Sequence, residues 1–282
     1  MTDNPLKQYF RQPSVYVKLP TKGAWYTNND VIMSADGEVA IYPMGAIDEI
    51  LLNTPDAMLN GQSLEKVIKN CVPDIKNVKR LLIPDLEAIF VGMKSANNEG
   101  KADIDRKCPN CNHENSFELD CSTLLDQIVY IDENDAIIKF DNDLVIYCKP
   151  YDMEMRQLWI RKEFEEEKII KSLDLDKESD EFRKAGHLSE SVDRLAQITF
   201  DLVSRSIVKI IMVKENIEIT DQKFISEWLR EISQKQSEIV IDTVNNLNKA
   251  GVLKEISMTC TACNHQWVDQ LNFDPTSFFG KR

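Results

Sequence analysis

The spacing of apolar residues in the first third of the chain changes between the two-residue period of strands and the 3.6-residue period of helices. It predicts two short strands followed by three short helices, in the order 15–19, 39–42, 47–52, 64–69 and 85–90. Before them, residues 1–14 are polar and contain two prolines, which predicts a flexible arm that orders only on a partner. We therefore expect a small mixed α+β domain at 15–107.

The second half of the chain has mostly helical spacing. Residues 128–149 first predict two strands joined by a tight Asp-Asn-Asp turn, which is typical of a β-hairpin. Helical spacing then continues through 192–208 and 220–250. The stretch 161–171 is so rich in Glu and Lys that we expect a solvent-exposed helix face. A largely helical domain is therefore predicted at 150–255.

Seven cysteines add chemistry to this pattern, because four of them form two C-x-x-C pairs. The first pair is Cys108 and Cys111, and the second is Cys260 and Cys263. Each pair is followed by Asn-His and then by a strand-like stretch. Asn suits this position because it tolerates a positive φ. Two such knuckles, each leading into a strand, indicate a zinc ribbon.

The simplest interpretation is one tetrahedral Zn²⁺ ion held by all four thiolates. Residues 112–259 separate the two pairs, whereas the halves of most ribbons are about 15–20 residues apart. The entropy of loop closure grows only slowly with loop length, so this separation is acceptable. The predicted fold class is therefore α+β, in which a split zinc ribbon, 108–149 with its β-hairpin and 256–272, joins the two domains.

Other interpretations of the four cysteines stay open. Two separate metal sites would need His113 and His265, which lie too near their own knuckles to complete a good tetrahedron. A redox dithiol would need a C-x-x-C pair at the start of a convincing helix. A site that has lost its metal is the last alternative. The remaining cysteines, Cys71, Cys121 and Cys148, have apolar neighbours and are predicted to be small core residues.

The composition narrows the class of protein. With 43% hydrophobic and 29% charged residues among 282, the chain is an ordinary globular sequence. It shows no signal peptide at its beginning and no apolar run of about 18 residues, so we expect neither export nor a membrane span. The net charge of −13 repels phosphate backbones, so nucleic acid is not an expected ligand.

Motifs for catalysis are missing from the sequence. Two of the three histidines belong to the knuckles, which leaves little for general acid–base chemistry. The sequence has no phosphate-binding glycine loop, nucleophile elbow or H-E-x-x-H motif. We therefore expect no small-molecule substrate and no enzyme activity, and predict a protein that acts by binding other proteins.

Aromatic residues near the two ends of the chain are candidate partner contacts. They are Trp25 and Tyr26 in an early turn, and Phe273, Phe278 and Phe279 in the Phe-rich tail 273–282. Aromatic side chains dominate the energetics of many interfaces. A tail packed on its own chain is an equally good interpretation.

Five sequence motifs occur in an order that resembles the baseplate proteins of T-even-like contractile-tailed bacteriophages. They are LPTKGAWY at 19–26, YPMGAIDE at 42–49, VIKNC at 67–71, LIPDL at 82–86 and CPNC at 108–111. The resemblance is clearest over 15–125 and points to the baseplate hub subunit or hub assembly protein family.

The resemblance implies a non-enzymatic structural or assembly role at the central hub of the baseplate. The implied partners are other hub proteins, and the implied location is the virion tail baseplate, reached from the host cytoplasm during assembly. Zinc would make the chain a rigid adaptor without disulfides in that reducing compartment. Two alternatives stay open: a transient hub assembly chaperone that is absent from the virion, and a zinc-ribbon transcription or replication factor.

Overall fold

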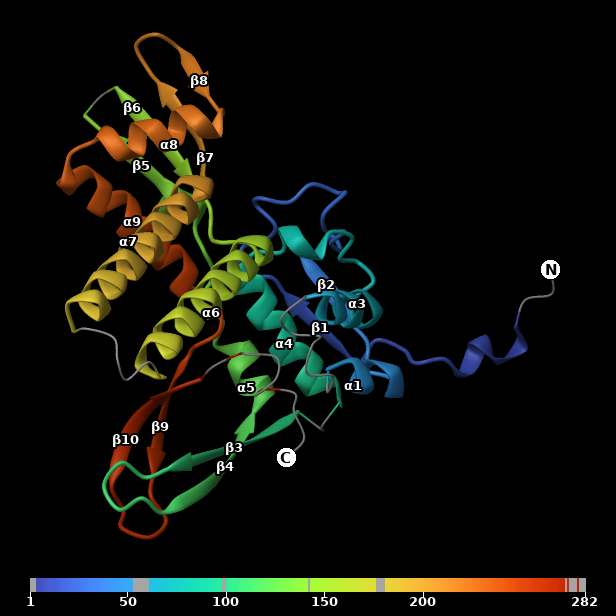
Figure 1. The fold of residues 1–282 in the computed structure, drawn as a ribbon. Coiled ribbons are helices and arrows are strands. Elements are labelled where there is room, and N and C mark those ends of the chain that lie inside the picture. Colours follow the sequence, from blue (N-terminus) through green and yellow to red (C-terminus); the bar gives the residue numbers. More distant parts are fainter. Residues whose placement is uncertain are drawn as a thin grey trace. The chain divides into compact units, whose positions relative to one another are not determined.

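The computed structural model describes residues 4–52, 61–97, 100–141, 143–175, 181–271, 273 and 278. The chain divides into two compact units (Figure 1). The first unit combines Met1–Ile131 with Ala250–Arg282, and the second unit is Asp132–Lys249. The second unit is therefore an insertion in the sequence of the first.

The first unit is a mixed α+β structure, as the apolar spacing predicts. In chain order its elements are the 3₁₀ helix η1 (Pro5–Tyr9), β1 (Val15–Lys18), β2 (Glu38–Ile41), α1 (Ala46–Leu52), α3 (Gln62–Cys71), the 3₁₀ helix η2 (Val78–Arg80), α4 (Ile83–Asn97), β3 (Lys101–Lys107), β4 (Glu114–Asp120), α5 (Cys121–Asp126), β9 (Glu255–Thr259) and β10 (Gln266–Gln270). The strands pair as the antiparallel hairpins β1–β2, β3–β4 and β9–β10.

Helix α4 is the centre of the first unit. All its residues from Ile83 to Met93 are buried, so no polar stripe faces solvent along this stretch. The β1–β2 hairpin packs against it. Gly92 makes the close approach of the two elements possible, because a Cβ atom there would lie 2.4 Å from Ile41 Cδ1 and 2.7 Å from Val17 Cγ2.

Asp85, in the first turn of α4, connects this helix to an early turn of the chain. Its buried carboxylate accepts hydrogen bonds from Thr21 N at 2.9 Å, Thr21 Oγ1 at 2.6 Å and Tyr26 Oη at 2.6 Å. The Tyr26 hydroxyl also accepts a hydrogen bond from Leu82 N at 2.7 Å. Burial raises the pKa of Asp85 to about 6, although these hydrogen bonds oppose the shift.

Asp48 in α1 makes a second connection of this kind. Its carboxylate accepts hydrogen bonds from Arg11 Nη1 at 2.9 Å, Gly45 N at 2.8 Å and Asn70 Nδ2 at 2.8 Å. Burial opposes ionisation, but these partners lower the pKa of Asp48 below its usual value. Residues 1–14 were expected to become ordered only on a partner. At Arg11 this segment is instead held by its own chain, through the hydrogen bond to Asp48.

The second unit combines one antiparallel sheet with long helices. Its elements are the 3₁₀ helix η3 (Glu133–Ala136), β5 (Ile137–Phe140), β6 (Leu144–Cys148), α6 (Met153–Leu175), α7 (Glu181–Ser206), β7 (Ile207–Met212), β8 (Ile217–Ile219), α8 (Gln222–Glu231) and α9 (Gln234–Lys249). The strands lie in the order β5-β6-β7-β8. Ile138, Ile146 and Ile210 stand opposite one another in the register, and all three are buried.

The predicted hairpin at 128–149 is β5–β6, but its place differs from the expected one. The sequence pattern groups it with the zinc ribbon, whereas in the structure β6 pairs with β7 in the sheet of the second unit. Helical spacing also predicts that the preceding helix runs to residue 208, but α7 ends at Ser206. Pairing with β6, about 60 residues earlier in the chain, is a long-range effect that helical spacing does not record.

The helix predicted over 220–250 is two helices, α8 and α9. The chain leaves the first helix and starts the second one at a capping box, which marks the beginning of α9. Ser233 Oγ accepts a hydrogen bond from Gln236 N at 3.4 Å, and Gln236 Oε1 accepts one from Ser233 N at 3.3 Å. The sequence Ser-Gln-Lys-Gln at 233–236 carries this signal.

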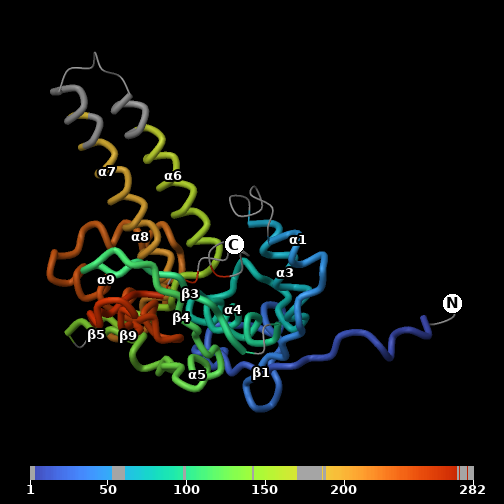
Figure 2. Tube along the Cα trace, turned by 90° about the horizontal axis from the view of Figure 1, so that it is seen from below, coloured from blue at the N-terminus to red at the C-terminus, as the bar shows by residue number. Residues whose placement is uncertain are grey.

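Helices α6 and α7 lie side by side (Figure 2) and are connected through Glu166. Its carboxylate accepts hydrogen bonds from Arg194 Nε at 2.8 Å, Arg194 Nη2 at 2.9 Å and the hydroxyl of Ser191. Glu165, one residue earlier, is exposed and pairs with Lys162 at 2.7 Å. The charged stretch 161–171 is therefore not solvated throughout, since Glu166 is buried.

Candidate metal centre

The two C-x-x-C knuckles have the same backbone structure. In each, the N–H of the first cysteine donates to the carbonyl of the histidine five residues later, and the N–H of the intervening Asn donates to the carbonyl of that cysteine. The N···O distances are 2.9 and 2.9 Å in the first knuckle, and 2.9 and 3.0 Å in the second. Asn112 and Asn264 have φ values of 58° and 55°, as expected for this turn.

The knuckles lie at neighbouring ends of the hairpins β3–β4 and β9–β10 (Figure 1). The Sγ atoms of Cys108, Cys111, Cys260 and Cys263 all lie within 4.8 Å of one another, which confirms that the fold joins the two pairs. The Sγ–Sγ distance is 3.7 Å between Cys108 and Cys263, and 3.6 Å between Cys111 and Cys260.

These separations fit a shared ion rather than disulfides. A tetrahedral Zn²⁺ ion with Zn–S bonds of about 2.3 Å would place its sulfurs about 3.8 Å apart. A disulfide would need about 2.05 Å, and all seven cysteines are free thiols. Cys71, Cys121 and Cys148 are buried outside the cluster, which confirms their prediction as core residues.

The cluster has a buried side and an exposed side. Cys108 and Cys260 are fully buried, whereas Cys111 and Cys263 are exposed. Burial opposes ionisation of Cys260, but the backbone N–H groups of Cys263 and Ala262 help lower its pKa to about 6. Thiolates are the form that binds metal, so these N–H groups favour cation binding.

The two exposed thiols differ in their ionisation. The N–H of His265 and the side chain of Asn110 lower the pKa of Cys263. The N–H of His113 acts in the same direction on Cys111, but the neighbouring thiols, Cys263 first, raise the pKa of Cys111 to about 12. A divalent cation would remove this conflict, because its charge stabilises several thiolates at one place.

Asn115 is a residue of this centre that sequence motifs do not reveal. It is buried, its Nδ2 lies 3.7 Å from Cys260 Sγ, and its Oδ1 accepts hydrogen bonds from Thr261 N and Thr261 Oγ1, both at 2.9 Å. It thus connects the two knuckles directly. The signal available in the sequence is a break in the repeat, since the matching position of the second knuckle is Trp267.

The hairpins β3–β4 and β9–β10 also contact each other through side chains of their strands. The rings of Phe117 and Trp267 meet edge to face at 6.0 Å, and Arg106 forms an ion pair with Asp269. The ring of His265 stacks on Trp267 at 6.3 Å. Neither His265 nor His113 belongs to the four-residue cluster found in the part of the chain that the structure describes.

A comparison with protein families identifies the family of this chain. A family model described as "T4 bacteriophage base plate protein" matches residues 44–280. The chain belongs to this family. No curated protein and no solved structure matches the chain.

The family match confirms the resemblance to phage baseplate proteins at the level of the family. It supports a structural or assembly role in the tail baseplate of a T4-like phage, in contact with other baseplate proteins. The match includes both knuckles and the whole second unit, and it begins after the β1–β2 hairpin. Across the described ranges, no helix of this baseplate protein has both the length and the apolar character needed to span a membrane.

The aromatic side chains predicted as partner contacts are mostly engaged by the first unit itself. Trp25 and Tyr26 are half-buried, and the Tyr26 hydroxyl belongs to the Asp85 network. Phe273 is only 2% exposed and packs edge to face on Phe278 at 5.3 Å between ring centres. The structure thus favours own-chain packing for Phe273. Phe279 lies outside the described residues.

Proposed function

We propose that this baseplate protein is a non-enzymatic structural or assembly component of the central hub. In this role one Zn²⁺ ion, held by Cys108, Cys111, Cys260 and Cys263, stabilises it as a protein-binding adaptor. The family match supports the baseplate role, and the ordered motifs that resemble hub proteins support the hub. The observation that carries the zinc proposal is the four-thiol cluster, whose spacing fits a tetrahedral ion.

The ion would connect two distant parts of one unit. The knuckles at 108–111 and 260–263 come from the two segments of the first unit, which are separated by the insertion Asp132–Lys249. When bound, zinc supplies metal–sulfur bonds between them. Asn115 holds the second knuckle near the first through Thr261, and so positions the four sulfurs for the ion.

The proposed partners are other hub proteins, and the proposed location is the tail baseplate of the virion, reached from the host cytoplasm. Nucleic acid, membrane and small-molecule substrates have no part in this role. The net charge of −13 and the absence of catalytic motifs from the sequence support this choice.

Metal analysis of the purified protein tests the zinc centre. We expect about one zinc per chain, because four thiolates complete one tetrahedral site. Cys108→Ser and Cys263→Ser should each release the ion. Cys121→Ser is the matched control, since Cys121 is a buried thiol outside the cluster. Two ions per chain, or full retention of metal in Cys263→Ser, would exclude the shared site.

The histidines of the knuckles provide a second test. His113 and His265 contribute backbone carbonyls to the turns, and both side chains are exposed. We therefore expect His113→Ala and His265→Ala to bind zinc at the wild-type stoichiometry. Loss of zinc in either variant would place that imidazole among the ligands.

Mass spectrometry of purified virions, combined with localisation in the tail, tests the hub. We expect the protein in finished particles, at the centre of the baseplate. A protein that tail assembly requires but finished virions lack would instead be a transient chaperone. Sub-micromolar DNA binding that weakens steeply with salt would support the zinc-ribbon transcription or replication factor.

A further inference from the structure

Each exposed thiol of the cluster lies against a buried thiol of the opposite knuckle. Exposed Cys111 has its Sγ atom 3.6 Å from that of buried Cys260. In the same way, exposed Cys263 has its Sγ atom 3.7 Å from that of buried Cys108. In each pair, a reagent in solution can therefore reach one sulfur, and the second sulfur is already in contact with the first.

Exposure decides which thiols a dissolved oxidant meets. A peroxide oxidises an accessible cysteine to a sulfenic acid, and a neighbouring thiol then converts the sulfenic acid into a disulfide. Cys71, Cys121 and Cys148 are buried outside the cluster. The exposed thiols of Cys111 and Cys263 are therefore the points of attack among the seven cysteines.

We propose that peroxide converts the cluster into two disulfides, Cys111–Cys260 and Cys108–Cys263, which connect the knuckles in place of a metal ion. In each pair, the exposed thiolate takes one oxygen from hydrogen peroxide and becomes a sulfenic acid, with release of one hydroxide ion. The buried thiolate then attacks the sulfenic sulfur, the S–S bond forms and a second hydroxide ion leaves. The two thiolates thus supply the two electrons that reduce one peroxide, and neither remains available as a metal ligand.

Disulfides across the knuckles would close long loops. Cys108 and Cys263 are 155 positions apart in the sequence, and Cys111 and Cys260 are 149 apart. In the chain-entropy account, a cross-link stabilises a fold more as the loop that it closes becomes longer. Cross-knuckle disulfides would therefore hold the two segments of the first unit together, whereas a disulfide inside one C-x-x-C pair would close only the turn of that knuckle.

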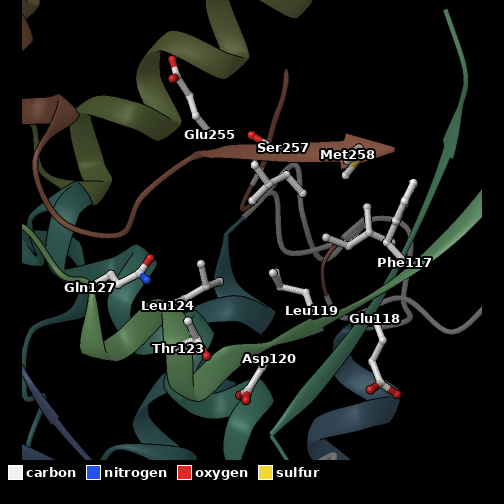
Figure 3. A pocket seen from close by; sticks show the side chains of 12 residues that line it. Phe117, Glu118, Leu119, Asp120, Thr123, Leu124, Gln127, Glu255, Ser257 and Met258 are labelled. Carbon is white, nitrogen blue, oxygen red and sulfur yellow. The ribbon is translucent and has the colours of Figure 1, made fainter. Parts of the chain in front are cut away.

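The two hairpins stand apart at a distance from the cysteines, so the connection at the knuckles matters. A cleft of about 410 Å³ lies between β4, α5 and β9 (Figure 3). Figure 3 shows Leu119, Leu124 and Met258 directed into this space. Because packing across the cleft is incomplete, the knuckle end contributes much of the attachment between β3–β4 and β9–β10.

The inference uses the positions of the four thiols alone, so it does not depend on zinc occupying the cluster. Its consequence concerns the proposed role in the virion, since a phage particle leaves the reducing host cytoplasm for an oxidising environment. There the two segments of the first unit would stay connected after loss of the metal.

Peptide mapping of the full-length protein tests the pairing. The protein is treated with hydrogen peroxide, its remaining thiols are alkylated, and it is digested with trypsin without a reductant. The trypsin sites place the knuckles in the separate peptides 108–139 and 255–281. We expect these two peptides to be joined, with fragmentation locating the bonds at the proposed pairs, and the Cys121→Ser control to give the same result. Disulfides inside each knuckle, or alkylated thiols in both peptides, would overturn the proposal.

Two double variants test the role of the exposed thiols. Cys108→Ser with Cys263→Ser leaves the pair Cys111–Cys260, so peroxide should still join the two peptides. Cys111→Ser with Cys263→Ser leaves only the two buried thiols, so the joined product should be lost. Equal rates of joining in both variants would overturn the proposal. Both variants lack two ligands, and the mapping of the wild type decides the pairing even where circular dichroism shows that they are unfolded.

Urea unfolding in EDTA tests the connection itself. We expect the peroxide-treated protein to unfold at a higher urea concentration than the reduced protein, and dithiothreitol to abolish this difference. Equal midpoints would show that the disulfides do not hold the two segments together. Zinc analysis separates the two proposals: joined peptides from a protein that binds no zinc support this inference and end the zinc proposal. Bound zinc together with disulfides inside the knuckles would do the reverse.

Discussion

The first unit joins segments that are distant in the sequence in two different ways. At the cysteine cluster, four thiols from 108–111 and 260–263 meet. At Asp85 and Asp48, one buried carboxylate collects hydrogen-bond donors from other segments, Thr21 and Tyr26 in the first case and Arg11 and Asn70 in the second. Both arrangements stabilise the same unit, but they depend on different chemistry.

The difference lies in what each connection needs to be complete. The carboxylates find their donors within the chain, so these connections form on folding. The thiols hold one another only weakly, since S–H is a poor donor, and a cation would supply the strong bonds. The cysteine connection should therefore respond to chelators, and the carboxylate connections to pH.

Removal of the proposed zinc ion should have the largest effect. Structural zinc contributes about 10–16 kcal/mol to folding in small zinc-finger peptides, and here Asn115 and the Arg106–Asp269 pair retain part of the contact. We expect EDTA or Cys260→Ser to lower the free energy of unfolding of the first unit by several kcal/mol. Urea unfolding measures this loss, and amide hydrogen exchange should show it at β9–β10.

The variants separate the metal from ordinary packing. EDTA should destabilise the wild type and Cys121→Ser, which keeps the cluster, but should leave Cys260→Ser unchanged. If EDTA leaves the free energy of unfolding of the wild type unchanged while Cys260→Ser lowers it, the thiols stabilise the unit by packing alone.

Loss of the Asp85 carboxylate should have the next largest effect. Asp85→Ala leaves the Thr21 N–H, the Thr21 hydroxyl and the Tyr26 hydroxyl without their acceptor in a buried place. Each unsatisfied donor costs about 1–3 kcal/mol, so we expect a loss of about 3–5 kcal/mol in urea unfolding. Tyr26→Phe, which removes one donor and the acceptor of Leu82 N, should cost about 1–2 kcal/mol. Neither loss should depend on EDTA; a dependence would mean that the two connections are coupled.

The sequence predicts the cysteine connection better than the carboxylate connections. Two C-x-x-C pairs with the same following residues form a local pattern with defined chemistry, and the structure brings their sulfurs together. Asp85 and Tyr26 lie 59 residues apart and belong to no recognised pair. Tyr26 is therefore predicted as an exposed contact, although it is half-buried and its hydroxyl donates to Asp85, which belongs to another segment.

The same limit explains the errors in secondary structure. Local spacing predicts the existence of most helices and strands, including β5 and β6. It does not predict that β7 begins at Ile207, because that strand is specified by pairing with β6. Local spacing does not predict the role of Asn115 either, because that role depends on Thr261 in the opposite knuckle.

The pH dependence of stability isolates Asp85 from other groups. Its folded-state pKa of about 6 lies above the usual aspartate value of 3.8, so the folded state binds more protons between these values. The contribution of Asp85 is therefore fully present below pH 3.8 and is lost as the pH rises to about 6. Relative to Asp85→Asn, which does not titrate, the wild type should lose about 2–3 kcal/mol over this interval. Urea unfolding of both proteins measures the difference; a constant difference would exclude the raised pKa.

Glu166 is buried like Asp85, so it tests whether the burial of the hydrogen-bond donor determines the strength of such a connection. Like Asp85 it accepts several hydrogen bonds, but its main partner, Arg194, is 41% exposed at the side chain. Solvent screening weakens such pairs, so we expect Glu166→Gln to cost only about 1 kcal/mol in urea unfolding of the second unit. Glu165→Gln is the matched control and should cost less than about 0.5 kcal/mol, because the Glu165–Lys162 pair is exposed on both sides. A loss in Glu166→Gln as large as that in Asp85→Ala would show that the number of hydrogen bonds, and not the burial of their donors, sets the effect.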